Sequence, residues 1–400
     1  MLRPDTIGLT TLLGLLTAFG PVATDMYIPS MPEISRLLDA STSEVQLTLS
    51  SYLAGIAIGQ VIYGPISDRY GRKPVLLLAL ALFCGASALC SAAPNVETLI
   101  IARTLQAIGG SGAIVLPRAI VRDLYEGDRA GRELSRISAV MSVAPVVAPL
   151  VGGILQLSFG WRASFLGILC VGLLATIITW RSMPETLRHH APPASAINIL
   201  RSYRTLAKNR VLLVHLGIVA SSYAGLFAWI SGSPFVLQDL YGLSAFGFSV
   251  AFALACIGSL TGAAIATSLV IRVGLDLTIG LGALTLASGG LAMVASMELG
   301  MAPVVSLVLS MMLYQIGLML AMPQAIAGSM APFPDRAGAA SSLIGFTQQT
   351  AAAVLGAVVG HTLGRTAWPL VIAVAMMGCV PLVLWTASRY RHRRRILARG

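Results

Sequence analysis

Charged residues are scarce in this chain, and their scarcity excludes an ordinary soluble protein. Only 11% of the 400 residues are Asp, Glu, Lys or Arg, whereas 56% are hydrophobic and the mean hydropathy is +0.82. Soluble domains usually carry about 25% charged residues. The composition therefore predicts a protein that lies mostly within lipid.

Cysteine and histidine are also few, with five of each. The cysteines show no C-x-x-C spacing and all fall in apolar stretches, where a thiol behaves as a small hydrophobic group; they are Cys84, Cys90, Cys170, Cys256 and Cys379. The histidines are scattered along the chain. We therefore expect no disulfide, metal site or cofactor. An enzyme is not expected either, because no nucleophile is clustered with a base.

Long apolar stretches, in contrast, fill the chain. A transmembrane helix needs about 20 mostly apolar residues. Stretches of that kind lie near 7–29, 44–66, 74–93, 97–120, 134–156, 162–180, 211–233, 245–270, 278–297, 303–326, 338–360 and 368–387. The first is too long for a signal peptide and lacks a following cleavage site. The predicted fold is an all-α membrane protein with twelve transmembrane helices in two six-helix bundles around a central cavity.

The longest hydrophilic interval, 181–210, divides these stretches into two equal sets. We therefore predict an N-terminal six-helix bundle over 1–180, a cytoplasmic linker over 181–210, a C-terminal six-helix bundle over 211–388 and a basic cytoplasmic tail over 389–400. Pro192 and Pro193 mark the linker, which is expected to end in a short amphipathic helix over 196–208.

The distribution of positive charge predicts the orientation. With the amino terminus in the cytoplasm, 22 of the 27 Lys and Arg residues fall in cytoplasmic segments, so both termini are expected there. The net charge of +11 is then explained by topology and contact of the tail with anionic membrane lipid rather than by nucleic-acid binding. We expect a multi-pass monomer in a bacterial inner membrane.

Asp25 interrupts the end of the first apolar stretch, within ATDMYIPSMP (23–32). An ionised side chain at the centre of a span costs about 2.5–3.5 kcal/mol, so a partner, a water-filled cavity or a proton is expected. Arg103 lies at a similar depth in the fourth stretch, and the two could pair directly or share a water network. They form either an ion pair that only fixes packing, or a site where Asp25 gains and loses a proton under the influence of Arg103.

Four further residues are candidates for the proton and substrate site. Tyr27 follows Asp25 closely, Gln106 lies one turn after Arg103, and Met141 lies in the fifth stretch. Arg118 follows Arg103 at roughly 22 Å along the same helix and on a similar face. It either faces the same cavity or extends to the cytoplasmic edge.

The loop between the second and third stretches carries a motif. Residues 64–73, GPISDRYGRK, resemble the G-x-x-x-D-R-x-G-R-R/K loop of the major facilitator superfamily. Asp68 can cap a neighbouring helix, while Arg69 and Arg72 can reach carboxylates on other helices. The resemblance implies a latch on the cytoplasmic side, formed by Gly64, Asp68, Arg69, Gly71, Arg72 and Asp123.

Two further segments resemble motifs of that superfamily. Residues 103–106, RTLQ, resemble an R-x-x-Q-G motif associated with proton coupling, with Ala107 in place of the glycine. Residues 144–153, APVVAPLVGG, resemble the G-P-x-x-G-G antiporter motif, with Ala148 in place of a glycine. Its candidates are Pro145, Pro149, Gly152 and Gly153. Ordinary small-residue packing between helices is the alternative.

The opening segment completes the resemblance. TDMYIPSMPEI (24–34) and the segment 46–75 are similar to the Bcr/CflA family of drug:proton antiporters, which includes bicyclomycin, chloramphenicol and florfenicol exporters. The similarity is strongest over 6–190. It implies alternating access and proton-driven export of small, mostly apolar drug-like compounds. Some relatives carry a second acidic residue where this chain has Thr17.

The second half offers weaker signals. Met312, Gln315, Met319 and Met322 share one helical face and could line an adaptable apolar cavity, although core packing explains them equally well. Tyr223 and Phe227, one turn apart, are similar candidates. The segment 272–276, RVGLD, could be a decayed copy of the 64–73 loop. A metabolite uniporter or proton symporter of the same fold remains the alternative function, and a membrane-embedded enzyme is a further one.

Overall fold

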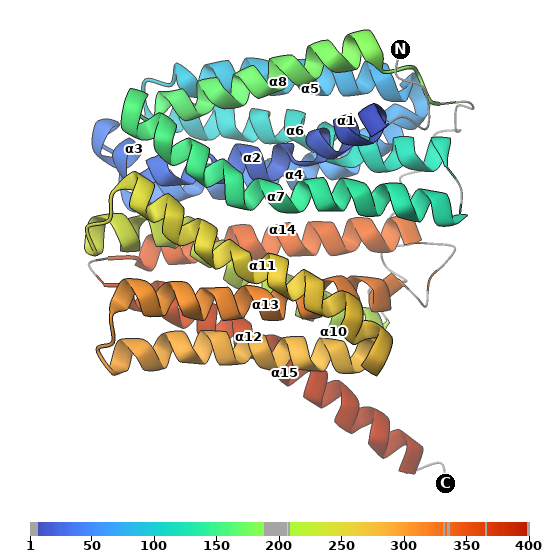
Figure 1. The fold of residues 1–400 in the computed structure, drawn as a ribbon, viewed down its shortest axis with the longest axis vertical. Helices are drawn as coiled ribbons and strands as arrows, with labels where there is room; N and C mark the ends of the chain where they lie inside the picture. Colours follow the sequence, from blue (N-terminus) through green and yellow to red (C-terminus); the bar gives the residue numbers. More distant parts are fainter. Residues whose placement is uncertain are drawn as a thin grey trace. The chain divides into compact units, whose positions relative to one another are not determined.

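The computed structural model describes residues 7–125, 127–187, 206, 209–330, 333, 337–364 and 366–397. Every regular element within these residues is helical (Figure 1). Eleven helices are long and apolar enough to cross a membrane, or up to 12 if one bent pair is counted as a single span. The predicted all-α membrane fold is confirmed.

The chain divides into two compact units. The first comprises Met1–Ala194 and Leu243–Ala253, and the second comprises Ser195–Gly242 and Leu254–Gly400. The predicted amphipathic helix over 196–208 lies outside the described residues apart from Leu206, which is helical. The boundaries proposed for the two bundles, the linker and the tail stay predictions.

The first unit is a bundle in which α6 is central. Its elements are α1 (Ile7–Thr17), α2 (Phe19–Asp25), the 3-10 turn η1 (Ile28–Ser30), α3 (Met31–Leu37), α4 (Thr42–Tyr70), α5 (Arg72–Ser91), α6 (Val96–Leu124), α7 (Gly127–Phe159) and α8 (Arg162–Ser182). α6 packs against α4 and α5, α5 packs against α8, and both α1 and α2 pack against α7.

The first span is broken rather than continuous. Its two parts, Gly8–Thr17 and Phe19–Leu37, are bent by 42° relative to each other. Pro29 and Pro32 stand in the first turns of η1 and α3, where the missing N–H costs nothing. The helical path therefore continues to Leu37, beyond the predicted end near residue 29, and Asp25 lies within it at the end of α2.

Polar caps fix the starts of several helices. Ser41 and Glu44 form a capping box at α4, with the Ser41 backbone N–H 2.7 Å from Glu44 Oε2. Asn95 accepts the Thr98 N–H at 2.9 Å and starts α6, and Asn209 accepts the N–H groups of Val211 and Leu212. These side chains satisfy donors that a helix leaves free at its first turn.

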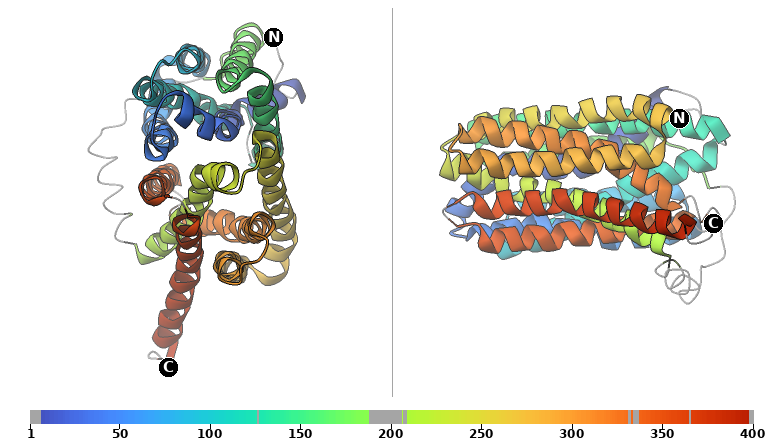
Figure 2. Two further views of the ribbon diagram at one scale, coloured as in Figure 1. Left: turned by 90° about the vertical axis from the view of Figure 1, so that its left-hand side faces the viewer. Right: turned by 90° about the horizontal axis from the view of Figure 1, so that it is seen from below.

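The second unit repeats the helical pattern. It contains α10 (Arg210–Pro234), the π turn η2 (Phe235–Leu240), most of α11 (Ala245–Val273), α12 (Leu275–Glu298), α13 (Pro303–Met330), α14 (Ala337–Thr362) and α15 (Trp368–Leu397). α12 packs against α13 and α15, while α10 packs against α13, α14 and α15. The last turns of α15, drawn in red, extend past the other helices of this unit (Figure 2).

The 272–276 segment has the backbone geometry of the first-half loop. Gly274 joins α11 to α12 with φ of 80°, just as Gly71 joins α4 to α5 with φ of 99°. Both values lie in the region that only glycine adopts freely. Asp276 then contacts α15, because its Oδ1 accepts the Trp385 Nε1–H at 3.1 Å and its Oδ2 lies 3.4 Å from Arg389 Nε. These similarities agree with an internal duplication.

The methionine face of α13 packs against α11 within the second unit. Ser259 of α11 donates a hydrogen bond to Gln315 Oε1. A β-carbon added at Gly258 would meet the main chain of Met312, so the two helices are in close contact there. Met312, Met319 and Met322 are half-buried, so both interpretations of this face, core packing and cavity lining, stay predictions.

Candidate functional site

Asp25 is the last residue of α2 and its side chain is buried, with 5% of the residue exposed. The aromatic residue two positions later is buried completely. The hydroxyl group of Tyr27 forms a hydrogen bond with Thr48 of α4, and its ring lies 5.4 Å from that of Phe165 on α8. The segment ATDMYIPSMP thus turns its polar groups into the helical bundle of the first unit.

Arg103 of α6 is fully buried beside this turn. Its Nη1 donates to the Ala23 carbonyl oxygen at 2.9 Å, two residues before Asp25. The guanidinium lies over the rings of Tyr52 at 4.1 Å and Tyr27 at 4.6 Å, with Phe165 at 5.8 Å. Because the ring faces are negative, they stabilise the buried cation.

Gln106 links Arg103 to a third helix. Its Oε1 accepts from Arg103 Nη1 at 2.6 Å, and its Nε2 donates to Ser87 Oγ on α5 at 2.8 Å. The R-x-x-Q spacing therefore allows Arg103 and Gln106 to form a hydrogen-bonded chain from α2 through α6 to α5. Nε and Nη2 of Arg103 donate to no protein group in the described part of the chain.

Asp25 and Arg103 form no direct ion pair among the described residues. Of the two expected arrangements, direct pairing is therefore absent in this structure. Arg103 is instead held by α2 main chain, by Gln106 and by aromatic faces. The electrostatic partnership of Asp25 and Arg103 stays a prediction.

The structure does not bring Arg118 and Met141 into contact with Asp25 or Arg103. Arg118 is exposed near the far end of α6, and Met141 is half-buried on α7. Both remain predicted members of the site on sequence grounds alone.

The 64–73 loop forms an ionic network around Arg72. Arg72 Nε lies 2.8 Å from Asp123 Oδ2 on α6, and its Nη1 contacts both Asp68 and the Ser67 hydroxyl, the latter at 2.6 Å. Asp68 therefore pairs with Arg72 rather than capping a neighbouring helix. Arg69 is exposed and lies over the Tyr70 ring at 5.2 Å, away from any carboxylate that the structure describes.

Glu185, which lies outside every motif found in the sequence, caps the start of α5. Its carboxylate oxygens accept the backbone N–H groups of Arg72 at 2.9 Å and Lys73 at 3.1 Å. The close approach requires glycine at position 71, since a β-carbon there would lie 2.7 Å from Glu185 Oε2. Gly64, by contrast, has no atom within 4 Å of its β-carbon position.

The contacts of Glu185 determine the direction in which the pKa of its carboxyl group is shifted. Burial alone would raise the pKa of its carboxyl, but backbone N–H groups of Leu187, Arg72, Lys73 and Thr186 outweigh that effect and lower the pKa. The sequence shows a carboxylate, Glu185, just after the sixth predicted span. Only the folded structure shows that it lies beside the start of α5.

The antiporter-like segment lies on α7, which remains helical through Pro145 and Pro149. Gly152 faces the main chain of Met26, so this segment touches the residue after Asp25. Gly153 faces Ser249, in the part of α11 that belongs to the first unit. Both glycines therefore sit at close helix contacts.

The second unit contains an apolar cavity of about 570 Å³. It is lined mainly by α10 and α14, including Ala220, Ala224, Phe346, Thr350 and Val354, with Met377 of α15. Tyr223 and Phe227 are not among its lining residues, and Phe227 is buried. No charged side chain of the described residues lines it.

Comparison with known proteins decides the family. The sequence profile of the Major Facilitator Superfamily matches residues 13–357. The chain belongs to the major facilitator superfamily. It is therefore a multi-pass membrane transporter and not an enzyme.

Relatives within the superfamily carry drug-resistance names. The chain is 31% identical over 396 residues to Multidrug resistance protein D of Escherichia coli, covering 98% of this chain and 99% of that protein. It is 30% identical over 391 residues to a bicyclomycin resistance protein homolog of Haemophilus influenzae, with 97% of each chain covered. These names agree with the resemblance of the opening segment to the Bcr/CflA family.

A solved structure supports the major facilitator fold independently. The crystal structure of D-xylose-proton symporter matches with a TM-score of 0.77 at 18% identity, covering 94% of this chain and 96% of that one. Such a low identity concerns the fold alone.

Proposed function

We propose that this chain is a proton-coupled antiporter that exports small, mostly apolar compounds of the bicyclomycin or phenicol class by alternating access. It would act in a bacterial inner membrane as a monomer with both termini in the cytoplasm. The single observation that carries this proposal is a buried Asp25 that has no ion-pair partner among the described residues and lies in the broken first span, between Ala23 and Met26, which contact α6 and α7.

The contacts around Asp25 support coupling between its charge and helix movement. Arg103 of α6 holds the carbonyl of Ala23, and Gly152 of α7 lies against Met26. A change of charge at Asp25 therefore acts on a turn that touches both helices. Small rearrangements there would be transmitted to α6 and α7, since packed contacts shift between discrete arrangements.

Burial makes an ionised Asp25 costly. An ionised carboxylate without a partner is costly inside a membrane, about 2.5–3.5 kcal/mol on insertion scales. We therefore expect Asp25 to carry a proton in conformations that bury it, and to lose the proton when the site opens to cytoplasmic water. A proton entering from outside would neutralise Asp25 and displace the exported compound.

The apolar cavity of the second unit supports small apolar cargo over polar metabolites. A sugar or amino acid needs several hydrogen-bonding or charged groups, whereas this cavity offers hydroxyl groups on a mostly apolar wall. Proton symport of a metabolite remains the alternative, and uptake rather than resistance would identify it.

The test is a growth-inhibition panel in a pump-deficient bacterium that expresses the full chain, with phenicols, bicyclomycin, sulfonamides and fluoroquinolones. Wild type should confer resistance that a protonophore removes. Asp25→Asn should express at wild-type level and confer none, while Asp39→Asn, at an exposed position, is the matched control. Resistance that persists with the protonophore, or in Asp25→Asn, would exclude the proposed proton mechanism.

A further inference from the structure

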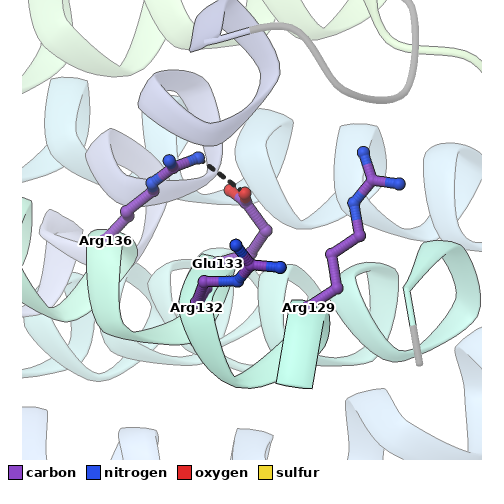
Figure 3. A pocket seen from close by; sticks show the side chains of 4 residues that line it. All are labelled: Arg129, Arg132, Glu133 and Arg136. Carbon is purple, nitrogen blue, oxygen red and sulfur yellow. Dashed lines mark hydrogen bonds and ion pairs between the residues drawn. The ribbon is translucent and has the colours of Figure 1, made fainter. Parts of the chain in front are cut away.

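The start of α7 forms a basic cavity away from Asp25 and Arg103. The cavity has a volume of about 320 Å³ and is lined by Arg129, Arg132, Glu133 and Arg136 (Figure 3). Their spacing of three, four and seven residues places all four on one face of the helix. The lining therefore comprises three guanidinium groups and one carboxylate.

Glu133 already contacts Thr10 and Arg136, so it does not neutralise a second arginine. It is 8% exposed, its Oε2 accepts from Thr10 Oγ1 of α1 at 2.6 Å, and its Oε1 lies 2.7 Å from Arg136 Nη1. Arg136 nevertheless keeps 63% of its side chain exposed. The carboxylate therefore orients Arg136 and connects the cavity to the first span.

The remaining arginines stand at the rim of the cavity. Arg129 lies over the Tyr125 ring at 5.2 Å, which fixes its direction, and Arg132 is exposed. Figure 3 shows Arg132 and Arg136 beside Glu133, with Arg136 bonded to it, and Arg129 to one side on the same helix. A planar guanidinium group can form two parallel hydrogen bonds to the oxygens of one phosphate group, and the lysine ammonium cannot form this bidentate contact.

The position of the cavity along α7 indicates which phosphate-bearing molecule it would bind. The cavity residues lie in the first turns of α7, at the start of the predicted apolar stretch 134–156, which places them near the headgroup phosphates of a bilayer. We propose that this cavity binds the phosphate group of an anionic phospholipid and thereby anchors the start of α7 and, through Glu133 and Thr10, α1. This site is independent of the proposed transport activity.

The experiment measures lipid binding to the purified full-length protein by native mass spectrometry, with phosphatidylglycerol compared with phosphatidylcholine. Wild type should retain phosphatidylglycerol preferentially. Arg132→Gln should bind it roughly tenfold more weakly, because it removes charge-assisted hydrogen bonds to the phosphate group. Arg132→Lys should bind phosphatidylglycerol with an affinity between those of wild type and Arg132→Gln, because it keeps the charge and loses paired hydrogen bonds.

Arg272→Gln is the matched control, because it removes one exposed arginine from the end of α11. Arg129→Gln provides a second test if Arg132→Gln is poorly folded. Equal retention of the two lipids, or equal weakening in Arg132→Gln and Arg272→Gln, would overturn the site. The phosphate could come from a lipid headgroup or from free inorganic phosphate, and adding inorganic phosphate distinguishes the two. If it fails to displace the lipid, binding of the headgroup is supported. If it displaces the lipid at millimolar concentration, the site binds free phosphate and the lipid proposal is overturned.

Discussion

Gly152 of α7 lies directly against the main chain of Met26, the residue after Asp25. A β-carbon at position 152 would lie 2.7 Å from the Met26 carbonyl carbon and 3.1 Å from its Cα. No side chain fits at these distances, so only glycine allows α7 to approach the turn that carries Asp25. The antiporter-like segment and the candidate proton site are therefore in physical contact.

Replacing Gly152 tests that contact. Gly152→Ala should destabilise the protein by about 1–3 kcal/mol, the usual cost of overpacking, and should abolish resistance because α7 is displaced from Met26. Thermal unfolding in detergent and the growth assay measure the two effects. Gly85→Ala, in α5, is the control, since nothing lies near its β-carbon position. Equal behaviour of the two variants would show that the contact is unimportant.

The ring of Tyr52 should matter more than its hydroxyl group. The ring faces the Arg103 guanidinium at 4.1 Å, whereas the buried hydroxyl has no hydrogen-bond partner in the described structure. Tyr52→Phe should leave thermal stability within about 0.5 kcal/mol or raise it slightly. Tyr52→Ala should lose about 3–5 kcal/mol, because it removes a buried ring and the cation–π contact. A stability loss in Tyr52→Phe as large as in Tyr52→Ala would reveal a necessary hydroxyl contact.

Glu185 should contribute stability that depends on pH. Its carboxyl pKa is lowered from the ordinary value of 4.5 in the folded state, so the stabilisation is complete above that value and is lost as pH falls through the folded pKa. Glu185→Gln should unfold at lower temperature than wild type near pH 7, because charged acceptors bind N–H groups more strongly.

The measurement is the difference in unfolding temperature between wild type and Glu185→Gln from pH 7 to pH 3. The difference should shrink below about pH 4.5. Glu97→Gln, which removes an exposed carboxylate from the first turn of α6, controls for the loss of one charge. A difference that stays constant over this range would mean that ionisation of Glu185 does not stabilise the fold.

Two site features were indicated by the sequence. Asp25 was singled out as an acidic residue in an apolar stretch, and the resemblance of the 64–73 loop to the superfamily motif implied Asp123 as a partner of the latch, where Arg72 contacts it. The roles of Glu185 and Tyr52 were not predicted. Glu185 is separated from Arg72 by 113 positions, and a carboxylate after a span has many potential partners until the helices pack.

The sequence by itself determined the membrane-spanning helices, the family and the glycine-dependent turns at Gly71 and Gly274. Apolar length, motif spacing and backbone conformation are local properties. Only the tertiary structure decided that Arg103 rests on Tyr27, Tyr52 and the Ala23 carbonyl instead of pairing with Asp25, and that Arg129, Arg132 and Arg136 surround one cavity. Helix rotation and packing set which side chains meet, and these depend on contacts between residues far apart in the chain.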